Sequence, residues 1–155
     1  MDAIRLAGRK DLERCVEIVR TLPDYFTPDV PDKVRSDWTR CATWVGERED
    51  RVLGMVMVER RSAKTAEILW AAVQAEHRGG GLGTALVNEV IGALGREGVE
   101  LLEVKTLDES ADYEPYVVTV AFWERRGFFK LDVINPLPGW HPGNPCAIYV
   151  QALHR

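Results

Sequence analysis

A glycine-rich stretch between an apolar segment and an amphipathic one is the feature of this sequence best suited to chemistry. It consists of Arg78, Gly79, Gly80, Gly81, Leu82, Gly83 and Thr84. Glycines permit positive φ and close backbone approach, so several N–H groups can converge at the start of the following helix, where the helix dipole adds positive potential. The arginine adds charged donors. The stretch therefore predicts a cradle for a pyrophosphate group.

Three kinds of phosphate-binding turn compete for this stretch. A Walker A loop needs a lysine directly after its last glycine, and this sequence has none there. A dinucleotide fingerprint, G-x-G-x-x-G, fails at its third glycine, which would be Leu86 or Thr84, although Glu103 lies about 20 residues further on, as a ribose-binding acid would. The third pattern, [RQ]-x-x-G-x-[GA], is matched at every defined position.

Hydrophobic periodicity predicts the elements that position this turn. Residues 65–74 are apolar almost throughout, which is typical of a central strand buried on both faces. Two alternating segments before it indicate a hairpin, with Gly54 marking a bulge. The predicted strands are residues 4–6, 44–47, 52–58, 65–74, 99–106, 128–134 and 147–153, and the predicted helices are residues 11–22, 31–40, 82–96 and 116–126. This order predicts a mixed α/β sheet with flanking helices, in one domain over residues 1–155.

The sequence resembles the GCN5-related N-acetyltransferase (GNAT) superfamily. The glycine pattern, carried by Arg78, Gly81 and Gly83, follows a segment similar to the family's fourth strand, AEILWAAV. LLEVKT is similar to the fifth strand, and AFWERRGFF to the second conserved helix with its Gly-Phe ending. The resemblance implies a mostly antiparallel sheet of about seven strands, splayed between the fourth and fifth, with about four helices.

The resemblance also implies acetyl-CoA as co-substrate. In this family the pantetheine arm enters the gap between the splayed strands, so it would pair with the backbone of Ala71, Ala72 and Val73. The pyrophosphate would rest on the N–H groups of residues 79–84. The thioester is then held beside the acceptor amine, and the N–H of Val73 is expected to polarise the thioester carbonyl.

Two carboxylates are candidates for the base that removes the amine proton. Glu67 lies in the fourth strand, at a position that resembles the base of histone-acetylating members. Glu103 lies in the fifth strand, at a position that resembles the base of ribosomal-protein N-terminal acetylases. We favour Glu67, because burying a charged side chain in so apolar a strand is costly and therefore suggests a functional role. Both residues remain candidates.

The family tyrosine that protonates the departing thiolate has no counterpart here. Four residues before the Gly-Phe ending the sequence has Trp123, and an indole cannot act as an acid. Tyr116 lies where the family commonly has an asparagine, and it is our candidate substitute, with Tyr113 as the alternative. Without an acid, a thiol of pKa about 8.5 leaves as thiolate at a cost of about 2 kcal/mol at pH 7.

The predicted function is direct transfer of an acetyl group from acetyl-CoA to a primary amine of a small molecule or a protein terminus. The alternative is a non-catalytic acyl-CoA-binding module, a sensor or regulator, which the missing tyrosine keeps open. Residues 23–40 and 135–145 are expected to wall the acceptor site. Their aromatic and acidic residues suit an amine cation: Tyr25, Phe26, Trp38, Trp140, Asp24, Asp29, Asp32 and Asp37.

Composition narrows the choice of partners. Twenty Lys and Arg against 24 Asp and Glu give a net charge of −4, which disfavours nucleic acids and anionic membranes. No apolar run approaches the roughly 20 residues of a membrane span, and no signal peptide is apparent, so we expect a cytoplasmic protein. Three scattered cysteines and three isolated histidines predict no metal site. A homodimer through residues 147–153, taken as an open sheet edge, is also expected.

Overall fold

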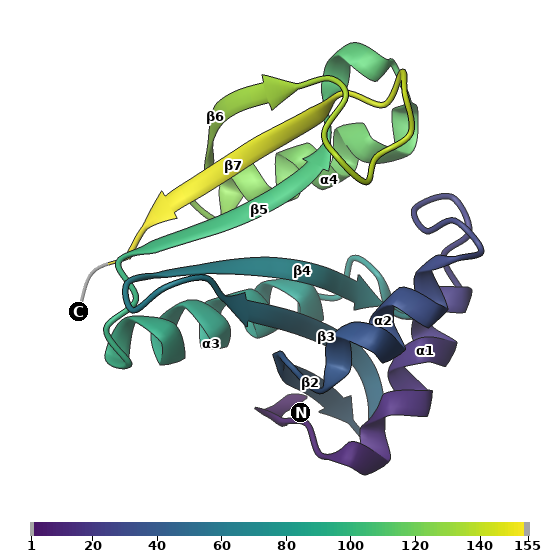
Figure 1. The fold of residues 1–155 in the computed structure, drawn as a ribbon. Coiled ribbons are helices and arrows are strands. Elements are labelled where there is room, and N and C mark those ends of the chain that lie inside the picture. The colour runs from purple at the N-terminus through teal and green to yellow at the C-terminus, as the bar shows by residue number, and fades with distance from the viewer. Residues whose placement is uncertain (1, 154–155) are drawn as a thin grey trace.

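The computed structural model describes residues 2–153, which form one seven-stranded sheet with helices on both faces (Figure 1). The strands are β1 (Asp2–Leu6), β2 (Ala42–Arg48), β3 (Arg51–Arg60), β4 (Thr65–Val73), β5 (Leu101–Leu107), β6 (Phe129–Ile134) and β7 (Cys146–Ala152). The helices are α1 (Leu12–Arg20), α2 (Val30–Trp38), α3 (Leu82–Arg96) and α4 (Glu114–Arg125). Every predicted strand and helix is present, with boundaries shifted by a few residues.

The sheet has the order β1-β2-β3-β4-β5-β7-β6, and only β4 and β5 are parallel. Their pairing covers four residues of each strand, from Thr65 with Leu101 to Ile68 with Val104. Beyond that point the two strands diverge, and the sheet opens like a V (Figure 1). The predicted splay between the fourth and fifth strands is therefore confirmed.

Two bulges bend β3 and β4, which both lie on the same side of this opening. In β3, Gly54 pairs with Gly46 but Val52 pairs with Glu47, so that Leu53 has no partner. In β4, Ile68 and Trp70 pair with adjacent residues of β3, so that Leu69 is the extra residue. A bulge bends its strand and increases the local twist. The second bulge lies where β4 leaves β5, so it turns the free end of β4 away.

Two apolar clusters cover the two faces of the sheet. Helices α1 and α2 pack on one face of β2, β3 and β4, with Val45, Met55 and Met57 at the centre. Helices α3 and α4 pack on the other face, against β3 to β5 and β7. Alternate residues of β3 enter opposite clusters, as the two-residue period of a strand requires.

The expectation that residues 147–153 form an open edge is wrong. Strand β7 pairs with β5 on one side and with β6 on the other, because the chain returns between these two strands. The edge on this side of the sheet is β6, where Phe129 and Leu131 are exposed. Hydrophobic patterning marks residues 147–153 as a strand but does not show which strands flank it.

Gly54 is required where α3 crosses the hairpin. A Cβ atom built on Gly54 would lie 2.9 Å from Leu86 Cδ1 and 3.3 Å from the carbonyl oxygen of Ala72. Leu86 is itself fully buried, so it has little room to move. The missing side chain therefore lets α3 lie close to β3, which sets the position of the glycine turn at the start of α3.

We expect Gly54→Val to lower the free energy of unfolding by about 1–3 kcal/mol, because it overpacks this contact. Gly8→Val is the control, since Gly8 has extended backbone and the nearest atom to its added Cβ is 3.9 Å away. Urea denaturation of both variants measures the difference. Equal losses would show that the contact with Leu86 is not what requires glycine at position 54.

Candidate active site

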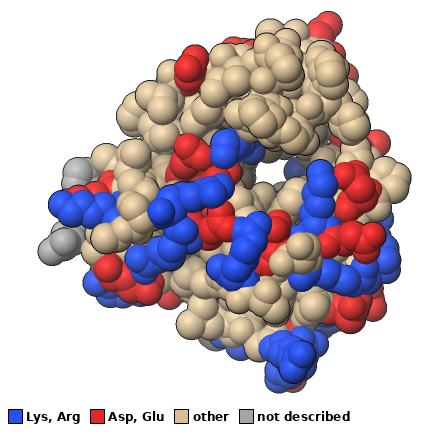
Figure 2. Space-filling model, in the orientation of Figure 1, with Lys and Arg blue, Asp and Glu red and all other residues tan. Residues whose placement is uncertain are grey.

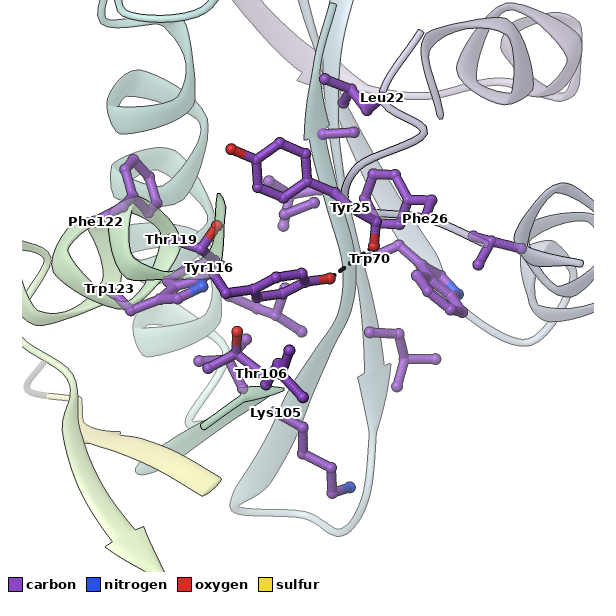
Figure 3. A pocket seen from close by; sticks show the side chains of 18 of the residues that line it. Leu22, Tyr25, Phe26, Trp70, Lys105, Thr106, Tyr116, Thr119, Phe122 and Trp123 are labelled. Atoms are coloured by element: carbon purple, nitrogen blue, oxygen red, sulfur yellow. Dashed lines mark hydrogen bonds between the residues drawn. The ribbon is translucent and has the colours of Figure 1, made fainter. Parts of the chain in front are cut away.

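A cavity of about 1330 Å³ lies where β4 and β5 diverge. The segment between α1 and α2, the N-terminus of α3, helix α4 and residues 137–144 complete its wall. Figure 2 shows the opening between the two halves of the molecule, and Figure 3 shows side chains that line it. The cavity joins the glycine turn at one end to a group of charged residues at the other.

The glycine turn forms a set of unpaired donors at the start of α3. Gly79 and Gly81 have φ of +83° and +89°, and no atom lies within 4 Å of a Cβ built on either. In residues 2–153 no protein acceptor is found for the backbone N–H groups of residues 79–84. Gly79, Gly80 and Gly81 are exposed, whereas Leu82 is buried and anchors the turn to the core. This open, donor-rich turn is suited to an anion such as pyrophosphate.

Two arginines border the turn. Arg78 lies over the ring of Tyr25, with its guanidinium carbon 4.3 Å from the ring centre. Arg126 donates a hydrogen bond to Thr84 Oγ1 and lies over the ring of Phe122. Sequence reasoning missed Arg126, which follows α4 and is 42 residues from Thr84. No local pattern connects these two residues, and only the packing of α4 beside α3 brings them together.

Beyond Ile68, the backbone of β4 has no strand partner on the side of the cavity among residues 2–153. Ala71, Ala72 and Val73 all line the cavity, and their pairing with β5 has ended at Ile68. On its other side this part of β4 is held by β3. Its free edge can therefore accept a further extended chain, as an unpaired strand edge does. These are the residues predicted to contact the pantetheine arm.

The two candidate bases are neighbours. Glu67 of β4 pairs in register with Glu103 of β5 on one side and with Glu59 of β3 on the other. Three carboxylates thus form a row across three strands, an arrangement that destabilises a sheet unless cations neutralise it. Glu67 is 3% exposed and lines the cavity, whereas Glu103 is half-buried and lies outside the lining.

Three cations alternate with these carboxylates. Lys105 Nζ lies 3.0 Å from Glu67 Oε2 and 3.1 Å from Glu103 Oε1. Arg61 pairs with Glu67 and Glu59, and Arg40 pairs with Glu59. Burial alone would lower the pKa of Lys105, but its hydrogen bonds to Glu67 and Glu103 outweigh burial and raise the pKa. Lys105 is thus a protonated cation shared by the two glutamates.

The tyrosines of α4 and the turn before it hold the segment that follows α1. Tyr116 donates a hydrogen bond of 2.7 Å to the carbonyl oxygen of Tyr25, and Tyr113 donates one of 2.6 Å to that of Asp24. Figure 3 shows the first of these bonds crossing the cavity. Burial raises the pKa of Tyr116 to about 12. Its proton is therefore already engaged and tightly held, which disfavours Tyr116 as an acid.

Trp123, at the position of the family tyrosine, is packed as a core residue. It is 4% exposed, and its ring makes edge contacts with Phe122 and Phe128 at centroid distances of 5.0 and 5.3 Å. It also lines the cavity. Trp123 thus forms part of the aromatic wall of the cavity and, as its residue type predicted, offers no acidic proton.

The amino-acid sequence matches the model of the acetyltransferase (GNAT) family over residues 12–128, which is most of the chain. The chain belongs to this family. Membership assigns it to the acyl-CoA-dependent N-acetyltransferases and accounts for the splay and the glycine turn together. No curated protein sequence matches the chain at a significant level.

Solved structures of GNAT proteins share this fold. A GNAT-family protein from Desulfovibrio desulfuricans has a TM-score of 0.83 at 23% identity, covering 98% of this chain and 99% of that one. The ribosomal-protein-S18-alanine N-acetyltransferase from Escherichia coli has a TM-score of 0.80 at 18% identity, covering 100% and 96%. A Bacillus subtilis acetyltransferase in complex with CoA has 0.78 at 16% identity, covering 99% of each chain. At these identities the likeness shows the fold alone.

Not all of the aromatic and acidic residues that were predicted to wall the acceptor site line the cavity. Tyr25, Phe26 and Trp140 line the cavity, together with Asp24, Asp29 and Asp37. Trp38 does not line it, because it packs against the core cluster under α1 and α2. Asp32 does not line it either and pairs with Arg35 on the surface.

Trp70 is a cavity residue that the sequence reasoning passed over. It lies on β4 just past the bulge (Figure 3), and its indole nitrogen donates a hydrogen bond of 2.8 Å to Asp37 Oδ2. The sequence did offer a signal for this residue, since a tryptophan stands out in a strand made mostly of small and aliphatic residues. The hydrogen bond ties α2 to the free end of β4.

Neither a metal cluster nor a membrane span is found in residues 2–153. No three His, Cys, Asp or Glu side chains in this range are placed to hold a metal ion. No helix of the same range is long and apolar enough to cross a membrane. Cys15, Cys41 and Cys146 are free thiols.

We expect Tyr116 to make stability depend on alkaline pH. Its folded pKa of about 12 lies above the ordinary value of 10, so its contribution is complete below pH 10 and is lost as the pH rises from 10 to 12. Urea denaturation at several pH values should show a steeper loss for the wild type than for Tyr116→Phe. Tyr113→Phe is the control, because Tyr113 is 40% exposed and bonds to the same segment. Parallel pH curves for wild type and Tyr116→Phe would contradict the assignment.

Proposed function

We propose that this GNAT protein transfers an acetyl group from acetyl-CoA directly to a primary amine of a small molecule or a protein terminus. The proposal depends on one observation, which is that a single cavity brings three features together. These are the N–H groups of residues 79–84, which have no partner in residues 2–153, the free edge of β4 and the buried carboxylate of Glu67. The first suits the pyrophosphate of CoA, the second its extended arm, and the third an amine.

The residues of the cradle and of β4 suit acetyl-CoA. Positive φ and open space at Gly79 and Gly81 leave room for phosphate oxygens at the turn. Arg78 and Arg126 add positive charge nearby. The free edge of β4 along Ala71, Ala72 and Val73 is available to the amide groups of the arm, and the N–H of Val73 is our candidate for polarising the thioester carbonyl. Acetyl-CoA supplies the activated acetyl group.

Lys105 is central to proton removal from the amine. Glu67 lines the cavity, but two cations already occupy its oxygens, so an incoming ammonium must displace one of them. Lys105 also contacts Glu103, whose only ion-pair partner in residues 2–153 is Lys105. We assign Glu67 as the base and Glu103 as the group that holds Lys105 when the acceptor binds. The amine proton then passes to Glu67.

No proton donor is assigned to the leaving thiolate. Tyr116, the predicted substitute, donates to Tyr25 and has a pKa of about 12, and Trp123 has no acidic proton. Release as thiolate costs about 2 kcal/mol at pH 7. The same feature favours the second candidate, a non-catalytic acyl-CoA-binding module, which would bind CoA and release no thiol with any amine.

The acceptor is expected to carry positive charge. Asp24, Asp29 and Asp37 lie beside an aromatic wall that includes Tyr25 and Phe26, a combination that suits an ammonium group. The single domain over residues 1–155, the cytoplasmic location and the homodimer remain predictions. For the dimer, β6 replaces residues 147–153 as the edge available for pairing.

We expect Gly81→Val to abolish CoA binding without unfolding the protein. A valine there fills the open cradle and blocks the approach of phosphate to the backbone. Gly98→Val is the control, because Gly98 also has a positive φ, of +92°, but it follows the C-terminal end of α3 and does not line the cavity. Isothermal calorimetry with CoA compares them. Normal CoA affinity in Gly81→Val would move the pyrophosphate site elsewhere.

We expect Glu67→Gln to lower the rate about 10²–10⁴-fold, as loss of a general base does. The defect should shrink as pH rises toward the pKa of the amine, about 10.4, because free amine no longer needs the base. Glu103→Gln should have a smaller and pH-independent effect. Glu59→Gln is the control, a carboxylate of the same row with no assigned chemical step.

Thiol release from acetyl-CoA with a panel of amines measures these rates. The opposite ranking of Glu67→Gln and Glu103→Gln would make Glu103 the base. If wild type binds CoA but releases thiol with no amine, the non-catalytic module replaces the enzyme.

A further inference from the structure

Thr106 has a buried hydroxyl with no hydrogen-bond partner. It lies on β5, in a buried row that begins with Leu102 and Val104, and it is 4% exposed. No acceptor or donor for its Oγ1 is found in residues 2–153. Valine has nearly the same shape and would pack equally well in this apolar row. The fold itself therefore does not require the hydroxyl of Thr106.

An unpaired buried hydroxyl is costly. Burying it without a partner costs about 1–3 kcal/mol relative to a satisfied one. Thr106 differs from an ordinary core threonine in its position, because it lines the cavity (Figure 3). Thr43 provides the comparison: its hydroxyl is equally buried and unpaired, but it lies on β2 outside the cavity wall.

The position of Thr106 along the cavity indicates which part of a bound acyl-CoA would lie next to it. The last paired residues of β4 and β5 are Ile68 and Val104, and Thr106 is two residues beyond that point. The phosphate cradle lies past the other end of the gap, after Val73. An arm that starts at the cradle and runs back along β4 thus brings its sulfur, the end farthest from the phosphates, toward Thr106.

We propose that the Thr106 hydroxyl donates a hydrogen bond to the sulfur of acyl-CoA and stabilises the thiolate as it departs. The proposal rests on the proposed function. As the amine nitrogen bonds to the acetyl carbon, the carbon–sulfur bond breaks and its electron pair passes to sulfur. Thr106 keeps its proton throughout. Glu67 takes one proton from the ammonium before the attack, and the nitrogen loses its second proton to water as the amide forms. The thiolate takes a proton from water after release. Thr106 thus supplies a hydrogen bond in a site that has no acid.

The test compares Thr106→Val, Thr106→Ser and the matched control Thr43→Val by calorimetry with CoA and with desulfo-CoA, which lacks the sulfur. Above the thiol pKa, Thr106→Val should bind CoA about tenfold more weakly or worse, as loss of a hydrogen bond to a charged group does. Its affinity for desulfo-CoA should not change. The pKa of the bound CoA thiol, followed by thiolate absorbance, should rise by about one unit in Thr106→Val.

The remaining variants complete the design. Thr106→Ser keeps the hydroxyl and should restore the thiol pKa, and Thr43→Val should bind both ligands as wild type does. Urea denaturation without ligand should show no loss of stability in Thr106→Val, because no protein partner is removed.

Three results would overturn the proposal. Equal weakening toward CoA and desulfo-CoA would place the contact on an amide of the arm. Unchanged affinities and thiol pKa would show that the hydroxyl does not touch the ligand. Destabilisation by Thr106→Val but not by Thr43→Val would reveal a structural partner. Failure of the wild type to bind either ligand would instead refute the proposed function, which keeps the two failures distinct.

Discussion

The separation of β4 from β5 is the constraint on which the rest of the structure depends. Parallel strands in a sheet normally continue to pair, since each unpaired backbone group loses a hydrogen bond. Here pairing stops after Ile68 and Val104, next to the bulge at Leu69. Beyond it, β4 is held by β3 and β5 by β7. The facing edges are left without strand partners, and the cavity exists because nothing in the described chain fills the space between them.

Contacts across the opening hold the two halves at a set distance. Tyr116 and Tyr113 reach from one half to the backbone of Tyr25 and Asp24 on the other. Arg126 makes a similar connection to Thr84 at the start of α3. Each contact joins a side chain to a turn or helix end, so the halves are linked through hydrogen bonds while the strand edges between them stay open to a ligand.

Charge is concentrated where the strands part. Glu59, Glu67 and Glu103 would repel one another across three strands if Arg40, Arg61 and Lys105 did not alternate with them. Such a network is stable only when each member is paired. In the proposed function, the ammonium group of the acceptor enters this network by exchanging places with a resident cation. The N–H groups of the glycine turn and the hydroxyl of Thr106 also lack hydrogen-bond partners in residues 2–153. These groups are therefore free to bond to a ligand.

The sequence alone determined the features that depend on neighbours along the chain. Period-two and period-3.6 patterns predicted each strand and helix, and the glycine turn predicted the cradle, because backbone freedom and helix-end donors are local properties. The resemblance to GNAT proteins added the splay. Only the tertiary structure decided which distant residues meet: Arg126 with Thr84, Lys105 between two glutamates, β7 inside the sheet, and Trp38 outside the cavity. Strand register and helix packing set these contacts, and both depend on the whole apolar core rather than on any short segment.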